Sequence, residues 1–541
     1  MKERYIELME TALKAYSIEK IYSLVQEIKE NGITEHGFPR LTANIGILIA
    51  HGRRFDLSDI FIEMMDICCE EIPNCKNHIA NDFSVKELVF AIIEIEKTDH
   101  VKAEKVHLWK DQLSKLDPWK DYDCIAPAEN VRVGNWAAYN AASEYMRNIL
   151  CECNSEDFLN RQIPSQLLSF DENGMYRDPD EPMLYDLATR SQFAVLLHFG
   201  YKGKFRNEID LFLKKAGPLT LKMQSPAGEI PFGGRSNQFL FNEAYLAAIC
   251  EFEASRYLKE GNIQIAGQFK DAAALASDSI FNWIDLTEGK KHVKNKFPTD
   301  SDFGCEDYGY FDKYMISLAS FIYLAWLFAD DFIEPKSCPA KLGGYTAQTS
   351  SYFHKFFANH KGYFLEWDTN ADTNYDATGL GRIHYADAPS ALILSVPFAK
   401  EPHYSIGKNN ADNMAFGLNN DPIKSITALE ETTEYLKILI EHDKSTEIFE
   451  LSDKGIRISI SGNEQILYNI PIFQFDGTEE TKTENSENEI SVVYRNWKYD
   501  LKTDGNIINT NIQYRNRNGY YNLFQIKKSE SLTVNLSVSK L

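Results

Sequence analysis

Residues 231–257, PFGGRSNQFLFNEAYLAAICEFEASRY, join a glycine-rich turn to a long segment with a helical pattern. Apolar residues recur there at helical spacing: Leu246 and Cys250 are four positions apart, and Phe239 stands two turns earlier. This spacing is typical of an α-helix that buries one face. Comparable segments follow one another in pairs to about residue 360, and helical hairpins in series build either a solenoid or a closed α/α toroid.

The loops between the helical segments favour the toroid. Short and long loops alternate, and the long ones hold the unusual residues, whereas the loops of a solenoid are more uniform. We predict helices over residues 3–30 (broken near Ser17), 40–52, 57–73, 85–97, 101–116, 134–153, 183–199, 206–223, 236–258, 262–285, 307–330 and 344–359.

The pattern changes in the last part of the chain. From residue 385 to 541 short apolar or alternating runs, such as TEYLKILIEH, GIRISIS and SLTVNLSVSKL, are separated by Gly, Asn and Asp. Such runs predict antiparallel strands. The expected fold is therefore mainly α with a β domain: a toroid of six to seven helical hairpins over residues 1–384, followed by an antiparallel β-sandwich over 385–541.

Length, charge and cysteines exclude several classes of protein. A chain of 541 residues is too long for one core, and a net charge of −22 without a basic run argues against a nucleic-acid partner. No segment has the roughly 18 apolar residues of a membrane span, and the N-terminus does not resemble a signal peptide. Nine scattered cysteines fit neither a disulfide framework nor a zinc site. We expect a cytoplasmic protein without a membrane partner, and a homo-oligomer is compatible with the sequence.

The glycine-rich turn carries the strongest functional signal. Gly233 and Gly234 allow positive φ or a close approach to a ligand. Arg235 follows at the expected start of a helix, where the helix dipole disfavours a cation. A carboxylate ligand would be bound there by both the guanidinium and the N-terminal amides. Glu243, two turns further on, would face another part of the same ligand.

Amides and a tryptophan stand at two expected helix starts. Asn237 and Gln238 follow the glycine-rich turn, and Asn135 and Trp136 open the segment GNWAAYNAASEYMR. Asn135 and Trp136 are either a helix cap followed by a core ring, or an amide and a stacking ring for a sugar.

Two further clusters combine charges with aromatic residues. Asp186 and Arg190 are four residues apart, as in an ordinary ion pair within a helix, although polar residues concentrate at that helix start. In CEDYGYFDKY, Glu306 and Asp307 are either acids at a helix N-terminus or members of a catalytic carboxylate pair, with Tyr310 on the same helix face.

The segment YDATGLGRIHYADAPSAL, at the expected domain junction, places Arg382 close to His384. A lone histidine is usually structural, but crevices between domains are common ligand sites. No P-loop, dinucleotide-binding glycine motif, HExxH or GxSxG occurs in the chain. We therefore expect no cofactor and no metal.

The motifs GNWAAYNAASEYMR, GEIPFGGRSNQFLFNEA and GLGRIHYADAPSAL resemble those of glycoside hydrolase family 154, whose members resemble exo-β-glucuronidases. The expected order of domains is similar to that of other toroid-plus-sandwich enzymes, which include polysaccharide lyases. The resemblance would cover nearly the whole chain. It implies removal of a uronic acid, in particular β-linked glucuronic acid, from the non-reducing end of an oligosaccharide.

The resemblance also implies roles for the candidate residues. Arg235 or Arg382 would bind the uronate carboxylate. Glu243 and the pair Glu306 and Asp307 would supply the two carboxyl groups that glycoside hydrolysis normally needs. One would protonate the leaving oxygen, and the other would activate water or attack the anomeric carbon.

Two alternatives stay open. A lyase would eliminate the uronate glycoside with Tyr308, Tyr310 or His384 as acid and base, and with Asn135 and Arg235 on the carboxylate. Hydrolysis is favoured over elimination because no Asn–His pair stands at a helix start in the sequence. A non-catalytic glycan-binding protein would instead have an aromatic cleft without a carboxylate pair.

Overall fold

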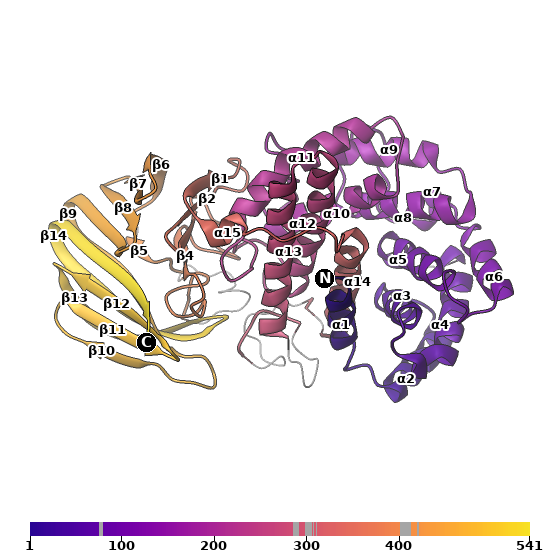
Figure 1. Ribbon diagram of the computed structural model, residues 1–541, viewed down its shortest axis with the longest axis horizontal. Coiled ribbons are helices and arrows are strands. Elements are labelled where there is room, and N and C mark those ends of the chain that lie inside the picture. Colours follow the sequence, from indigo (N-terminus) through magenta and orange to yellow (C-terminus); the bar gives the residue numbers. More distant parts are fainter. Residues whose placement is uncertain are drawn as a thin grey trace.

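The helical and the strand-rich parts of the chain lie side by side in the computed structural model (Figure 1). The structure describes residues 1–74, 79–284, 292–297, 306, 308–309, 311–400, 413–418 and 421–541. The α-helices are α1 (Lys2–Ala12), α2 (Ile18–Asn31), α3 (Gly37–Ala50), α4 (Ser58–Glu71), α5 (Ile79–Ile95), α6 (Ala103–Leu113), α7 (Pro118–Asp121), α8 (Trp136–Cys151), α9 (Glu156–Leu167), α10 (Met183–His198), α11 (Arg206–Met223), α12 (Phe241–Lys259), α13 (Ile263–Trp283), α14 (Phe311–Phe328) and α15 (Pro339–Leu342).

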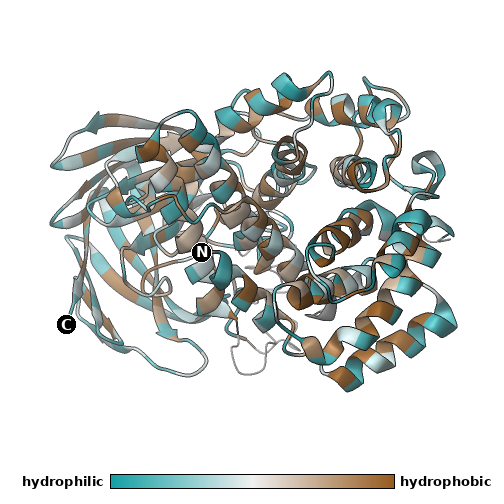
Figure 2. Ribbon diagram, turned by 45° about the vertical axis from the view of Figure 1, so that its right-hand side comes forward, coloured by the Kyte–Doolittle hydropathy of each residue, from teal (hydrophilic) through white to brown (hydrophobic). Residues whose placement is uncertain are grey.

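The long helices form a closed ring, which confirms the predicted toroid. Among the described residues, α3, α5, α8, α10, α12 and α14 each contact the next, and α14 returns to α3. Outer helices pack against this inner ring, for example α4 on α3, α9 on α8 and α13 on α12. Figure 2 shows brown, apolar residues concentrated on the inner helices, and teal, polar residues on much of the outer ones. The six inner helices agree with the predicted six to seven hairpins.

The start of the chain closes the outer layer of the toroid. Helix α1 packs on α14, and the N-terminal amino group lies 3.0 Å from Oδ1 of Asp331. The break predicted near Ser17 is confirmed, because α1 ends at Ala12 and the Ser17 hydroxyl accepts a hydrogen bond from the Lys20 amide at the start of α2. Within the described part of the chain, no helix is long and apolar enough to cross a membrane.

Two antiparallel sheets form the predicted sandwich. The smaller has the order β1-β2-β3-β4, and the larger the order β10-β11-β12-β14-β9-β8-β7-β6, with β13 on β14 and β5 on β9. The strands are β1 (Tyr345–Gln348), β2 (Lys355–His360), β3 (Tyr363–Asp368), β4 (Gly379–Tyr385), β5 (Gly417–Leu418), β6 (Ile423–Glu431), β7 (Tyr435–His442), β8 (Ser445–Ser452), β9 (Gly455–Phe475), β10 (Lys482–Asn485), β11 (Glu489–Tyr494), β12 (Trp497–Thr503), β13 (Asn506–Asn516) and β14 (Gly519–Lys540).

The smaller sheet lies between the toroid and the larger sheet, and it explains one error of the sequence analysis. The helix predicted over residues 344–359 is wrong, because β1 and β2 occupy that range. Phe356 and Ala358 pack into the core shared with the larger sheet, whereas Phe357 packs with Met175 and Met183 of the toroid. A strand that is buried on both faces lacks the alternation that distinguishes a strand from a buried helix. Strands therefore begin at Tyr345, ahead of residue 385.

Candidate functional site

The N-terminal parts of all six inner helices line one cavity of about 370 Å³. Because the parallel N-termini of these helices meet there, their dipoles direct positive partial charge into the cavity. The lining residues are mostly aromatic or basic. They are His36, Arg40, Phe83, Asn135, Trp136, Tyr139, Leu184, Tyr185, Ala188, Arg235, Phe241, Tyr245, Tyr308, Lys313, Tyr314, Ser317 and Phe321.

A chain of hydroxyl groups crosses the wall of this cavity. The Tyr185 hydroxyl lies 3.2 Å from Oγ of Ser236, which also hydrogen-bonds to the hydroxyl of Tyr308. Ser236 has a φ of +69°, a conformation that non-glycine residues rarely adopt, and its amide donates to Glu306. Burial raises the pKa of both tyrosines, so both are protonated at neutral pH and can donate a proton.

The glycine-rich turn holds Arg235 beside this chain of hydroxyls. Gly233 and Gly234 have φ values of +92° and +77°, and a β-carbon on Gly234 would lie 2.6 Å from Cα of Pro182. The Arg235 guanidinium lies 4.7 Å from the centre of the Tyr185 ring. It also forms an ion pair of 2.8 Å with Asp178, and 30% of its side chain is exposed. Asp180 also lies 3.7 Å from Nε of Arg235, so an anionic ligand would bind the exposed part of this side chain.

An asparagine and a histidine stand at the starts of two different helices that line the cavity, although the sequence shows no Asn–His pair at one helix start. Asn135 directly precedes α8 and His36 directly precedes α3, and both line the cavity. The Asn135 side chain makes no capping hydrogen bond, and Nδ1 of His36 has no hydrogen-bond partner. Burial, Arg40 and Lys313 hold the pKa of His36 well below its usual range, so its imidazole is neutral and can accept a proton.

Trp136 is the exposed ring of the cavity. Its side chain is 38% exposed, and it packs edge-on against Phe83, which also contacts His36 and Tyr139. An exposed indole beside an amide suits stacking on the flat apolar face of a sugar. The structure excludes the alternative of a helix cap followed by a core ring, and the stacking role stays a prediction.

The predicted acidic pair lies behind the cavity wall or outside the described residues. Glu306 is buried and accepts the Ser236 amide; burial raises its pKa, while hydrogen bonds from Tyr308 and Ser236 oppose this shift. Asp307 and Tyr310 lie outside the described residues. Asp178 is also buried, and burial raises its pKa to about 6 despite Arg235. Glu306 and Asp178 thus approach the cavity from behind, through Ser236 and Arg235.

Glu243 does not line the cavity. It is fully buried in α12, where Oε1 lies 2.8 Å from Nζ of Lys294 and accepts the Ile230 amide at 3.2 Å. Its neighbours place it in the contact region between toroid and sandwich. The structure therefore gives Glu243 a role in an ion pair.

Three other candidate residues are also buried in structural contacts. Nδ2 of Asn237 donates to the Pro231 carbonyl at 2.7 Å and shapes the glycine-rich turn. The main-chain carbonyl of Gln238 accepts from the Lys294 amide, and its side chain is fully buried. Arg190 forms a buried ion pair of 2.5 Å with Asp186, as the simpler interpretation of that motif predicted.

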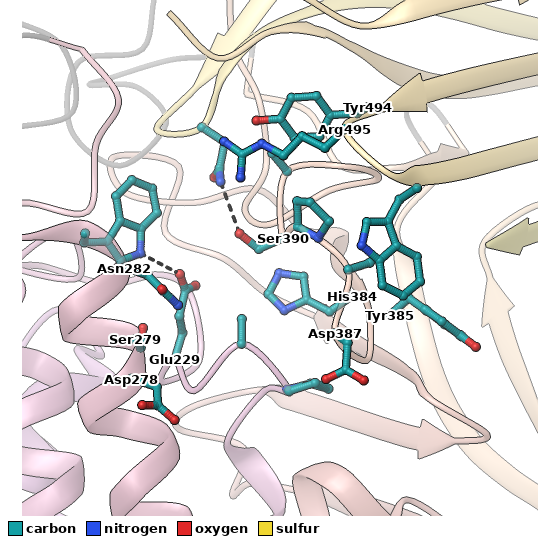
Figure 3. A pocket seen from close by; sticks show the side chains of 18 of the residues that line it. Glu229, Asp278, Ser279, Asn282, His384, Tyr385, Asp387, Ser390, Tyr494 and Arg495 are labelled. Carbon is teal, nitrogen blue, oxygen red and sulfur yellow. Dashed lines mark hydrogen bonds between the residues drawn. The ribbon is translucent and has the colours of Figure 1, made fainter. Parts of the chain in front are cut away.

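Arg382 and His384 lie on β4, away from the toroid cavity. Arg382 is fully buried and pairs with Glu366 at 2.8 Å and with Glu229 at 3.4 Å. His384 lines a separate crevice of about 460 Å³ between toroid and sandwich (Figure 3). The predicted site residues thus lie in two separate places. Asn135, Trp136, Arg235 and Tyr308 line the toroid cavity, whereas His384 lines the crevice between toroid and sandwich.

Several residues of the toroid cavity do not stand out in the sequence. His36 stands in EHGFPR, ahead of the helix predicted over residues 40–52, and Arg40 and Lys313 lie inside apolar helical segments. Only the convergence of six helix starts brings these residues together. In the part of the chain that the structure describes, no group of three or more His, Cys, Asp or Glu side chains is placed to hold a metal ion.

The comparisons with known proteins find similarity in the fold and not in the sequence. No family model and no curated protein sequence matches the chain, so the resemblance to family 154 stays a prediction. The structure of a mutant of the heparan sulfate lyase HepC from Pedobacter heparinus superposes with a TM-score of 0.50 and 9% identity, over 93% of this chain and 76% of that chain. This likeness shows the fold.

Two other solved structures are more distantly similar. The heparinase III product of BT4657 gives a TM-score of 0.38 and 9% identity over 89% of this chain and 69% of that chain. A β-L-arabinofuranosidase of family GH127 from Geobacillus stearothermophilus gives a TM-score of 0.37 and 9% identity, over 99% of this chain and 80% of that chain.

Proposed function

We propose that the toroid cavity cleaves uronate-containing oligosaccharides by β-elimination. The observation that carries this proposal is the chain of Tyr185, Ser236 and Tyr308 hydroxyls beside Arg235, in a cavity that Asn135 also lines. Elimination needs a cation or amide on the carboxylate, a base and an acid, and the cavity supplies all three. A heparan sulfate lyase with the same fold supports a glycan as the substrate class.

Each group has a role that follows from its surroundings. Arg235 and Asn135 bind the uronate carboxylate and make the C5 proton more acidic. The neutral imidazole of His36 takes that proton, a double bond forms between C4 and C5, and the C4–O bond breaks. The Tyr308 hydroxyl gives its proton to the leaving oxygen. No water is consumed, so atoms and charges balance within substrate and side chains.

The positive field of the cavity supports an anionic substrate. Six helix N-termini and the side chains of Arg40, Arg235 and Lys313 surround the cavity, although the whole protein is acidic. These cations are partly compensated, since Arg40 pairs with Glu87 and Lys313 with Glu35. The exposed indole of Trp136 provides a stacking surface for the sugar ring.

Hydrolysis of a uronic acid from the non-reducing end is the second candidate. Two buried carboxyl groups with raised pKa values, Asp178 and Glu306, lie behind Arg235 and Ser236, and hydrolysis normally uses two such groups. Among the described residues that line the cavity, however, none is an acid. This arrangement favours elimination.

One experiment separates the two reactions. The protein is incubated with β-glucuronides and uronate-containing oligosaccharides, and products are followed by absorbance near 232 nm and by mass spectrometry. Elimination gives a rising ultraviolet band and no mass gain. Products that carry one added water, without the band, would replace elimination by hydrolysis. Binding without either product would leave a glycan-binding protein.

Two tyrosine variants test the assignment of the acid. Tyr308→Phe should lower kcat about 10²- to 10⁴-fold, because it removes the proton donor. Tyr145→Phe is the matched control, since the Tyr145 hydroxyl donates to the Phe199 carbonyl outside the cavity. Equal activities of the two variants would contradict the role of Tyr308.

A further inference from the structure

The crevice between toroid and sandwich has aromatic walls from both domains. Trp283 ends α13 of the toroid, whereas Tyr385 ends β4 and Trp497 begins β12 of the sandwich. The crevice has a volume of about 460 Å³, within the usual range of small-molecule sites. It shares no lining residue with the toroid cavity.

Buried polar atoms without partners line this crevice. His384 is only 2% exposed, and neither of its ring nitrogens has a hydrogen-bond partner. Figure 3 shows its imidazole near the middle of the crevice, between Glu229 and Tyr385. Oδ1 of the buried Asn518 also lacks a partner. Because buried polar groups in native proteins are nearly always hydrogen-bonded, these atoms point to a ligand that donates and accepts hydrogen bonds.

The charges beneath the crevice are balanced. Burial alone would raise the pKa of Glu229, but Arg517 and Arg382 lower it to about 2, so Glu229 is ionised. Glu229 also accepts a hydrogen bond of 3.1 Å from the Trp283 indole. Arg382 also pairs with the buried Glu366, so two carboxyl groups face two guanidinium groups there. Among the lining residues, Asp278 and Asp387 match Lys296 and Arg495 in number, so no ionic group is required of the ligand.

We propose that this crevice is a second carbohydrate site, which binds a neutral sugar unit. The ring hydroxyls of a sugar donate to Oδ1 of Asn518 and to the acceptor nitrogen of His384, and accept from the other nitrogen of His384. Trp283, Trp497 and Tyr385 enclose its apolar faces. A neutral imidazole has one donor and one acceptor nitrogen, and a sugar hydroxyl can accept from the first and donate to the second. This binding goes beyond the proposed cleavage and does not depend on it.

The test is a titration of the full chain with glucose, galactose, N-acetylglucosamine, cellobiose and lactose. Binding is followed by saturation-transfer NMR and by tryptophan fluorescence, because Trp283 and Trp497 lie in the crevice. At least one of these sugars should bind. Trp497→Ala and Asn518→Ala should each weaken this binding about tenfold or more. The matched control, Trp119→Ala, removes an exposed indole that lines neither the crevice nor the cavity.

The outcomes separate this proposal from the proposed cleavage. Trp497→Ala and Asn518→Ala should keep the activity of the toroid cavity, which also shows that they fold. Tyr308→Phe should keep the binding of neutral sugars. Absence of binding by all five sugars up to about 50 mM, a very weak affinity, would overturn the proposal. It would also be overturned if Tyr308→Phe, and neither crevice variant, abolished the binding.

Discussion

Nζ of Lys294 lies 2.8 Å from Oε1 of Glu243, and neither side chain is exposed to solvent. Burial raises the pKa of Glu243 and lowers that of Lys294, and each charge opposes the shift of the other. Such a pair holds residues 292–297 against α12, the helix that follows the glycine-rich turn. Glu243 thus supports the wall of the cavity from outside.

The first prediction is that Glu243→Gln destabilises the protein. Removal of one partner deprives the buried Lys294 of its hydrogen-bonded carboxylate, which should lower the free energy of unfolding by about 3–5 kcal/mol. Denaturant unfolding measures this loss. The double variant Glu243→Gln with Lys294→Met should recover part of it.

The buried pair of Glu251 and Lys270, also 2.8 Å apart, gives a matched control away from the cavity. Glu251→Gln should destabilise the protein to a similar extent. A Glu243→Gln protein of normal stability that had lost its activity would contradict the structural role and restore Glu243 as a catalytic acid.

Much of the fold could be predicted because helical periodicity is a local property. Most of the inner and outer helices lie close to their predicted ranges, but the outer helix α9 was not predicted; the break at Ser17 is visible as a cap. The strands β2 and β3 could not be recognised, since both faces of each are buried. The burial of Phe357 against the toroid depends on contacts with residues far away in the sequence.

The site was only partly predictable for the same reason. Arg235, Asn135 and Trp136 stand out locally, by a glycine turn or a helix start. His36 becomes a candidate only when the ring closes and brings α3 beside α14. Lys294, the partner of Glu243, lies in a segment without periodicity, so the sequence offered no sign that this acid was paired.

The second prediction concerns Trp136. Trp136→Ala should raise KM about tenfold with little change in kcat, because a stacking ring binds substrate and transition state alike. Steady-state kinetics on the cleaved oligosaccharide measures both constants. Trp119 is similarly exposed, at 42% against 38%, but lies on α7 outside the cavity. Equal KM values for Trp136→Ala and Trp119→Ala would exclude stacking on Trp136.

The third prediction is the pH dependence of cleavage. Burial, Arg40 and Lys313 lower the pKa of His36 well below 6.5, so the free enzyme keeps this base neutral at mildly acidic pH. The acid limb of the kcat/KM profile should therefore fall below pH 6.5. His36→Ala should lose activity at every pH, whereas His100→Ala, on the outer surface, should leave the profile unchanged. An acid limb above pH 6.5 would exclude His36 as the base.

The fourth prediction links His384 to stability. Burial, followed by the Arg382 charge, lowers the pKa of His384 to about 3, against about 6.5 in the unfolded chain. Because the unfolded state binds the proton more tightly, this contribution to stability is complete above pH 6.5 and is lost as the pH falls towards 3. The free energy of unfolding, measured between pH 4.5 and 7.5, should depend less on pH in His384→Asn than in the parent protein.

His107→Asn, at a surface histidine, is the control and should show the same dependence of the free energy of unfolding on pH as the parent protein. An unchanged pH dependence in both variants would contradict the prediction.

The fifth prediction concerns Arg235, which is partly exposed and bound to Asp178 and Tyr185. Arg235→Ala should lower kcat/KM for uronates about 10²- to 10³-fold, because a charge-assisted contact to the carboxylate is lost. The free energy of unfolding should change by only about 1 kcal/mol, as for other partly exposed ion pairs. Arg235→Lys keeps the charge but loses the planar guanidinium, so its kcat/KM should lie between those of the parent protein and Arg235→Ala.

Arg161→Ala, on the outer helix α9, controls for the loss of a guanidinium. Parallel losses of stability and activity in Arg235→Ala would mean that Arg235 serves the fold, since a carboxylate contact would reduce activity alone.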